Sequence, residues 1–355
     1  MSQPPLKAIS TYALDIICVG GASIALLLPL LFIPKDSALY FGALGFPVLN
    51  VILNYPHFMA SYRLLYRSWT NVKAHLNAAV WVPLLLLMWS VLGLSLAEED
   101  GSVVHLMIMS SAIYIAWHYT GQAWGMMATF ASLHALPFAA RERRLIRAGM
   151  ALLVGWHVTL ALVTVSQAPP PVMTWFEDAN GIAAVIAPVS VLLGFIGLIL
   201  HRRRTGKIAP LRVILPWVAL HIWYCIMGSD IRALLLIQVA HSVQYLIFPA
   251  RIEMNRHNES PPRESKAVHL FIYLGLLGVC GWFVFEGLPT LVVMLFVRSG
   301  AGALDSEGVR LFPLVLSAFL NIHHFYVDGS IWKLSDPAVR RSLFSHLETP
   351  RTTPT

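Results

Sequence analysis

Long apolar segments separated by short polar ones make up most of this chain, from near its N-terminus to about residue 334. About 20 consecutive apolar residues in a helix span the hydrocarbon core of a bilayer. Ten segments fit that length, and each is expected to form one membrane-spanning helix. They are 11–33, 38–66, 75–96, 103–133, 146–166, 181–200, 210–228, 231–248, 267–297 and 311–334. Pro289 interrupts the ninth segment, so a helix followed by a re-entrant piece, with nine spans in all, is an open alternative.

The charges of the connecting segments predict the orientation. Basic residues follow every second apolar segment, as at 141–147 and 202–207, while alternate loops carry acids such as Glu98. Cytoplasmic loops of membrane proteins are enriched in Lys and Arg. The alternation therefore places both termini in the cytoplasm and favours an even number of spans. We expect an all-α, polytopic helix bundle over 1–334 and a short cytoplasmic tail over 335–355.

The composition agrees with an integral membrane protein. Of the 355 residues, 57% are hydrophobic and only 12% are charged, whereas a soluble domain carries about 25% charged residues. In a soluble protein the net charge of +7 would favour a nucleic-acid partner. Here the basic residues lie in short loops between apolar segments, which is a topology signal, and nucleic acid is not expected. The three cysteines stand singly in apolar segments and form neither a metal motif nor a disulfide framework.

Four of the apolar segments carry a polar cluster built around a histidine. A titratable side chain inside a membrane helix is costly, and by default it marks a functional site. The candidate histidines of the four clusters are His57, His118, His241 and, in the last cluster, His324 or His323. His323 lies about 100° around the helix from His324, so the two imidazoles are not expected to face one centre.

The predicted topology gives these histidines a common depth. The four helices all run from outside to inside, and His57, His241 and His324 precede the basic end of their helix by nine or ten residues. At about 1.5 Å per residue, the three rings lie roughly 15 Å above the cytoplasmic ends. Unrelated histidines would have no reason to match in depth. We therefore expect the four rings to meet in one pocket.

Imidazoles that meet inside a helix bundle suit a transition metal, because imidazole is a ligand for iron, copper, zinc and nickel. Four polar side chains lie three or four residues after a candidate histidine and thus on its face of the helix. They are Gln122, Gln244, Tyr245 and Asp328. We expect them to orient the metal-bound rings or to contact the substrate. Asp328 is the single acid within the clusters, so the site should be dominated by histidine rather than by carboxylates.

Histidines in membrane helices have other uses, which stay open at this point. They can serve only as hydrogen-bond partners between helices. A proton-coupled transporter or channel would use the membrane acids Asp15 and Glu286 together with helices broken by proline. A haem-binding redox or assembly protein would use histidine pairs as axial ligands.

The order and spacing of the clusters resemble those of the Brp/Blh membrane proteins, the bacterial and archaeal β-carotene 15,15′-dioxygenase family. The matching motifs are Pro56-His57, His118-Tyr119, His241-Ser242 and the histidine pair 323–324 followed by Asp328. The chain departs from the family at Ser61, where the family has an aspartate, and at Tyr245, where it tends to have a histidine. The resemblance covers four patches of sequence.

This resemblance implies a polytopic protein that uses histidine-bound iron and dioxygen to cleave a carotenoid. We accordingly expect an oxygenase or other oxidoreductase with Fe²⁺ as cofactor, another transition metal being the alternative. Its partners would be the lipid bilayer and a lipophilic substrate such as an isoprenoid or a carotenoid. We expect it in the inner membrane of a bacterium, and the oligomeric state is left open.

Overall fold

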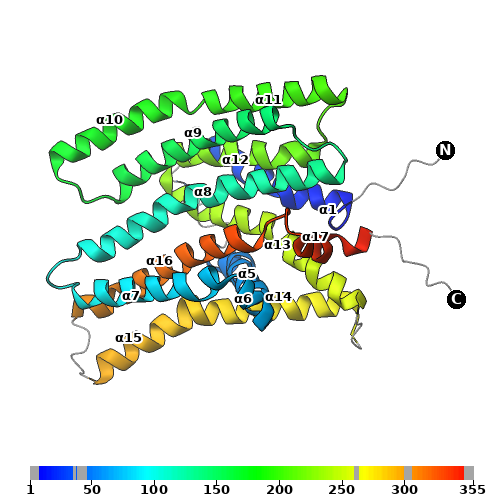
Figure 1. The fold of residues 1–355 in the computed structure, drawn as a ribbon. Helices are drawn as coiled ribbons and strands as arrows, with labels where there is room; N and C mark the ends of the chain where they lie inside the picture. The colour runs from blue at the N-terminus through cyan, green and yellow to red at the C-terminus, as the bar shows by residue number, and fades with distance from the viewer. Residues whose placement is uncertain (1–7, 35–36, 38–45, 260–263, 300–305, 348–355) are drawn as a thin grey trace.

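The computed structural model describes residues 8–34, 37, 46–259, 264–299 and 306–347, which form a bundle of helices (Figure 1). No β-strand occurs among these residues, and the expected all-α bundle is confirmed. Residues 38–45, where the second predicted span begins, lie outside the described residues, as do 348–355 of the predicted tail.

The helices follow one another along almost the whole described chain. In order they are α1 (Tyr12–Ile16), α2 (Ala22–Leu27), α4 (Phe46–Leu49), α5 (Tyr55–Tyr66), α6 (Trp69–Ala74), α7 (Val82–Ser95), α8 (Ser102–Leu133), α9 (Ala140–Val165), α10 (Pro170–Ile186), α11 (Val189–Thr205), α12 (Leu211–Ser229), α13 (Leu234–Glu259), α14 (Lys266–Trp282), α15 (Leu288–Ser299), α16 (Ser306–Ile331) and α17 (Pro337–Phe344). Short π-helical turns join α1 to α2, α4 to α5 and α14 to α15. The ninth predicted span is thus one continuous helix rather than a helix with a re-entrant piece.

Wide helical turns accommodate three of the prolines. Each of three π-helical turns ends two residues before a proline: Asn50–Asn54 before Pro56, Asn77–Trp81 before Pro83, and Phe283–Gly287 before Pro289. Proline lacks an amide hydrogen, and its ring crowds the carbonyl four residues earlier. A turn with hydrogen bonds five residues apart makes room for that ring while the helix continues. The first of these turns ends three residues before His57. It therefore helps to set the direction in which the His57 side chain leaves α5.

The chain between α9 and α12 differs from the prediction. The sequence predicts one span at 181–200 after a polar loop, whereas the structure has α10 and α11 with only Ala187 and Pro188 between them. Proline is favoured in the first turn of a helix, where the amides have no partner in any case. Pro170 therefore begins α10 instead of extending the loop, and Pro188 ends it.

Six helical stretches are long and apolar enough to cross a membrane. They are Tyr12–Leu31, Asn77–Ser95, Ala140–Val165, Pro170–Thr205, Leu211–Ser229 and Lys266–Leu295. The helices that carry the polar clusters, α5, α8, α13 and α16, are not among them. These stretches indicate an integral, multi-pass membrane protein, while ten spans and cytoplasmic termini stay predictions. Helices α1 and α17 lie at the same end of the bundle (Figure 1).

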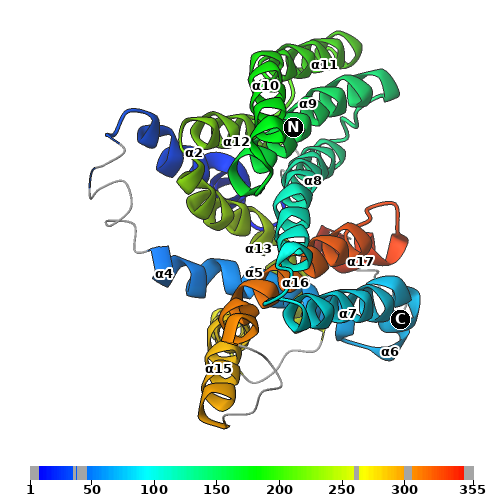
Figure 2. The same cartoon turned by 90° about the vertical axis from the view of Figure 1, so that its left-hand side faces the viewer.

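The four helices that carry the histidine clusters meet near the centre of the bundle. Viewed along the helices, α8 stands with α9–α12 on one side, and α5, α7 and α16 lie on the other (Figure 2). Helix α16 packs against α5, α7 and α8, and α13 packs against α5. Side chains from four segments far apart in the sequence can therefore reach one point.

Candidate metal centre

Five titratable side chains from four helices come together at this centre. They are His57 on α5, His118 on α8, His241 on α13, and His324 and Asp328 on α16. Each is buried, with 9% or less of its surface exposed. His324 and Asp328 are four residues apart and share a face of α16, as expected from their spacing. The structure therefore brings together one candidate histidine from each cluster.

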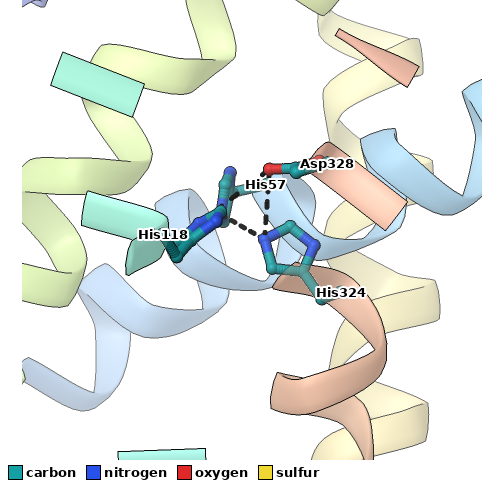
Figure 3. Close-up of side chains that lie close together, drawn as sticks. All are labelled: His57, His118, His324 and Asp328. Carbon is teal, nitrogen blue, oxygen red and sulfur yellow. Dashed lines mark hydrogen bonds and ion pairs between the residues drawn. The ribbon is translucent and has the colours of Figure 1, made fainter. Parts of the chain in front are cut away.

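The rings meet through their Nε2 atoms. The Nε2 atoms of His118 and His241 lie 2.8 Å apart, and those of His57 and His324 also lie 2.8 Å apart. Asp328 Oδ2 is 3.5 Å from His324 Nε2 and 3.9 Å from His118 Nε2. One donor atom each from His57, His118, His324 and Asp328 all lie within 4.8 Å of one another, and Figure 3 shows these side chains pointing inward.

This donor set suits a transition metal. Ligand atoms held about 2.1 Å from one tetrahedral or octahedral ion stand roughly 3.0–3.4 Å apart. The four pairs of donor atoms given above are 2.8 to 3.9 Å apart, which brackets that range, and all donors of the group lie within 4.8 Å of one another. Three imidazoles and one carboxylate are ligands for iron, zinc and related ions, and we call His57, His118, His324 and Asp328 the metal-site group. His241 Nε2 lies 2.8 Å from His118 Nε2 but is not one of the four donor atoms that share this spacing.

Three side chains hold the Asp328 carboxylate in place. Ser61 Oγ donates to Asp328 Oδ1 at 2.6 Å and lies 2.6 Å from the hydroxyl of Tyr245. The Tyr245 hydroxyl is 3.1 Å from the same Oδ1 and accepts a hydrogen bond from Trp332 Nε1 at 2.8 Å. These contacts satisfy Oδ1 and leave Oδ2 directed at the histidines. Tyr245, one of the predicted orienting residues, thus acts on the carboxylate.

The two predicted glutamines contact backbone and each other rather than the metal-site group. Gln122 Nε2 donates to the carbonyl of His241 at 3.1 Å and to Gln244 Oε1 at 3.3 Å. Gln244 Nε2 donates to the carbonyl of Val19 at 2.8 Å. These bonds connect α8, α13 and the N-terminal helix around His241. Because the carbonyl of His241 accepts one of them, that bond also fixes the position of this histidine.

The structure distinguishes the two adjacent histidines of α16. His323 Nε2 lies 2.8 Å from the carbonyl of Ala78, and its ring stacks on Tyr62 with centroids 5.2 Å apart. It points away from the metal-site group, while His324 points into it. The 100° separation of neighbouring residues on a helix accounts for this difference.

The two membrane acids named above also have partners. Asp15 forms a buried ion pair with Arg212, with an O–N distance of 2.6 Å. Glu286 accepts a hydrogen bond from the hydroxyl of Tyr55. Both acids therefore connect helices, which is the structural role that sequence alone could not separate from proton transfer.

Sequence reasoning missed part of the support for Asp328. Trp332 was not singled out, although it follows Asp328 by four residues and so shares its face of α16. Ser61 lies in the first polar cluster, four residues after His57, but nothing in the sequence ties it to Asp328. The spacing signal existed for Trp332, but the link from Ser61 to Asp328 joins residues 267 positions apart and needs the tertiary structure.

A small polar cavity lies behind the rings. The Nδ1 atoms of His57 and His241 and the hydroxyl of Tyr119 are buried and have no hydrogen-bond partner among the described residues. All three side chains line a cavity of about 10 Å³, together with Asn54, Gln238 and Asn321. That volume is about the size that one water molecule needs. A single water there would satisfy Nδ1 protons when the Nε2 atoms hold an ion.

A larger cavity opens on the other side of the metal-site group. Its volume is about 530 Å³, and His118, Tyr245 and Asp328 form part of its wall. Ligand pockets commonly occupy roughly 300–1,000 Å³. The site thus has room for a small molecule beside the candidate metal.

Comparison with known proteins adds no assignment. No family model matches the chain, and no curated protein and no solved structure matches it either. The proposed function is therefore inferred from the geometry of the site, the chemistry of its residues and the motif resemblance.

Proposed function

We propose that this protein is a membrane-embedded metalloenzyme that binds iron at the metal-site group and oxidises a lipophilic substrate. The observation that supports the proposal best is the convergence of three imidazoles and one carboxylate within 4.8 Å, all buried. Buried titratable groups are costly unless they pair or bind a metal. Bound iron would supply the capacity to react with dioxygen, as the resemblance to the Brp/Blh proteins implies.

The side chains of the protein have distinct tasks in this proposal. His57, His118 and His324 hold the ion through Nε2, and Asp328 supplies an anionic oxygen. His241, 2.8 Å from His118, is available as a further ligand. Ser61, Tyr245 and Trp332 are positioning residues, since they orient the carboxylate without lying in the metal-site group. The surrounding apolar helices exclude water, which limits side reactions of oxidised species.

The substrate class follows from location and resemblance. A centre inside a helix bundle with several stretches apolar enough to cross a membrane favours a substrate that dissolves in lipid. On the motif resemblance, we propose an isoprenoid or a carotenoid. Incubation of the purified, iron-loaded protein with β-carotene and dioxygen, followed by chromatography of the products, tests this part separately from metal binding.

Metal content provides the first test. The protein is expressed with ample iron, purified, and its metals are measured by mass spectrometry. We expect a stoichiometric transition metal in the wild type and loss of about 90% or more in His118→Ala and His324→Ala, because a removed ligand also disturbs its neighbours. Absence of any transition metal from the folded wild type would contradict the proposal.

The chain offers a matched control for this experiment. His323 is buried beside His324 on the same helix, but it bonds to a backbone carbonyl. His323→Ala removes the same imidazole volume and should keep its metal per folded molecule. Equal loss of metal in both variants would mean that disturbance of α16, and not ligation, explains the effect.

A transporter would show uptake into proteoliposomes that survives chelation.

A further inference from the structure

A buried arginine on α13 lies away from the metal-site group. Arg251 follows His241 by ten residues, which corresponds to about 15 Å along the helix axis. Only 8% of its surface is exposed, and its Nε atom is buried with no hydrogen-bond partner among the described residues. Burial of a charged group is costly unless the group is paired and hydrogen-bonded. Packing alone therefore gives no reason for an arginine at this position.

Arg251 faces the end of the bundle where α17 meets the N-terminal segment, residues 8–15. Asn255 is four residues later and so lies on the same face of α13, and its Nδ2 donates to two backbone carbonyls of α17, at 2.9 and 3.2 Å. His346, just after α17, is close enough to Arg251 for their charges to interact, and its Nε2 lies 2.8 Å from the carbonyl of Ala8. Helices α1 and α17 share this end of the bundle (Figure 1). The arginine thus lies where both ends of the chain pack against α13.

The acid whose charge acts on Arg251 is already bound by other groups. This acid is Asp15, and its Oδ2 accepts hydrogen bonds from Arg212 Nη1 at 2.6 Å and from the amide of Ile9 at 3.0 Å. Its Oδ1 accepts a hydrogen bond from the amide of Ser10 at 3.0 Å. One carboxylate therefore stands against two guanidinium groups. An anion beside Arg251 would complete the balance of charge.

A phosphate group suits this position. A guanidinium presents its N–H donors in a planar fork that matches the oxygens of a phosphate. The Nδ1 atom of His346 is also buried with no hydrogen-bond partner among the described residues, and it offers a second polar contact. Arg340 and Arg341 are exposed on α17 and add positive charge at this end. In a bundle suited to a membrane, basic residues beside the apolar helices attract anionic headgroups.

We propose that Arg251 binds a phosphate group at the junction of the N-terminal segment, α13 and α17. This anion site connects both ends of the chain through one ligand. The phosphate belongs either to the headgroup of an anionic phospholipid or to free phosphate, and the experiment below distinguishes these sources. The anion site shares no residue with the metal-site group, so its occupancy does not depend on the proposed function.

Lipid binding by the full-length protein tests the anion site. The protein in detergent is supplied with phosphatidylglycerol or phosphatidylcholine, retained lipid is counted by native mass spectrometry, and the melting temperature is measured with each lipid and with inorganic phosphate. We expect phosphatidylglycerol, but not phosphatidylcholine, to be retained and to raise the melting temperature. A rise with inorganic phosphate as well assigns the site to phosphate alone, and a rise only with phosphatidylglycerol assigns it to the headgroup. Arg251→Gln removes the charge and should weaken binding about tenfold or more.

Arg256→Gln is the matched control. Arg256 is on the same helix, and it contacts Glu253, which also pairs with Arg63. This variant should bind phosphatidylglycerol like the wild type. If Arg251→Gln does not fold, Arg251→Lys, which keeps the charge but not the planar fork, should still bind less than the wild type. Equal binding by the wild type and the Arg251 variants, or equal loss in Arg256→Gln, would overturn the proposal. A wild type that responds neither to phosphatidylglycerol nor to inorganic phosphate would overturn it as well.

Discussion

At the scale of single residues, the partner of each histidine separates the candidate ligands from the rest. His324 meets His57 and Asp328 through Nε2, whereas His323 bonds to a backbone carbonyl. Because His323 Nε2 donates its proton to that carbonyl, this nitrogen has no lone pair to offer to an ion, and it does not face the metal-site group. Two imidazoles 2.8 Å apart can share only one proton, and an ion between several such rings would satisfy all their Nε2 lone pairs.

The serine that supports Asp328 gives a prediction at this scale. Ser61→Ala removes the donor to Oδ1, so the carboxylate loses one of the contacts that direct Oδ2 to the histidines. Loss of such a support typically costs about 10–100-fold in metal affinity. Titration of the metal-free protein with Fe²⁺ under anaerobic conditions measures the change. Ser330→Ala, on α16 but bonded only to the carbonyl of Tyr326, should bind like the wild type.

At the scale of helices, glycine serves two purposes. At some positions it allows two helices to pack closely, and at others it leaves open space. Gly281 lets α14 approach α5, because Tyr55 occupies the space in which a side chain would stand. Small residues at helix contacts allow such approaches within membranes. Tyr55 in turn precedes Pro56 and His57, so this contact supports the segment of α5 that carries a candidate ligand.

Gly281→Leu should therefore destabilise the protein. The added Cβ would lie 2.5 Å from the Cβ of Tyr55 and 3.0 Å from its carbonyl oxygen, which forces α14 away from α5. Overpacking of this kind costs about 1–3 kcal/mol, and we expect a lower melting temperature in detergent. Gly275→Leu on the same helix is the control, since a Cβ there would meet no heavy atom within 4 Å among the described residues. An equal fall in both variants would contradict the packing argument.

At the scale of the whole molecule, the metal-site group joins the two sides of the bundle. His118 comes from α8, which packs with α9 and α12 and also with α16, whereas His57, His324 and Asp328 come from α5 and α16 on the other side (Figure 2). An ion bound by all four would link these sides directly. The binding energy of such an ion would then contribute to the stability of the folded bundle.

Removal of the metal should consequently lower the thermal stability. A ligand present at about 1,000 times its Kd stabilises the folded state by roughly 4 kcal/mol. We expect the wild type to melt at a lower temperature after chelation and to recover when Fe²⁺ is restored, as followed by tryptophan fluorescence. His324→Ala should show no response to the chelator. A wild-type melting temperature that is indifferent to chelation would argue against a metal that links the helices.

Sequence reasoning reached the class of fold and most of the site. Polar clusters at helical spacing on apolar segments predicted that His57, His118, His241 and His324 would meet, and the structure brings them together. It did not reveal the α10–α11 pair, because a run of prolines indicates a loop as readily as a helix start. The ten spans, the orientation and the iron stay predictions, because the positions of the side chains identify neither the membrane boundaries nor the metal.

The sequence by itself determined that this protein is a helix bundle suited to a membrane and rich in buried histidines. Length, hydropathy and helical periodicity are local properties, and they can be evaluated along a single segment. Only the tertiary structure decided that His324 rather than His323 faces the centre, that Ser61 holds Asp328, and that Asn255 of α13 bonds to α17. Each of these depends on how segments far apart in the chain pack, and local sequence does not determine the rotation of one helix against another.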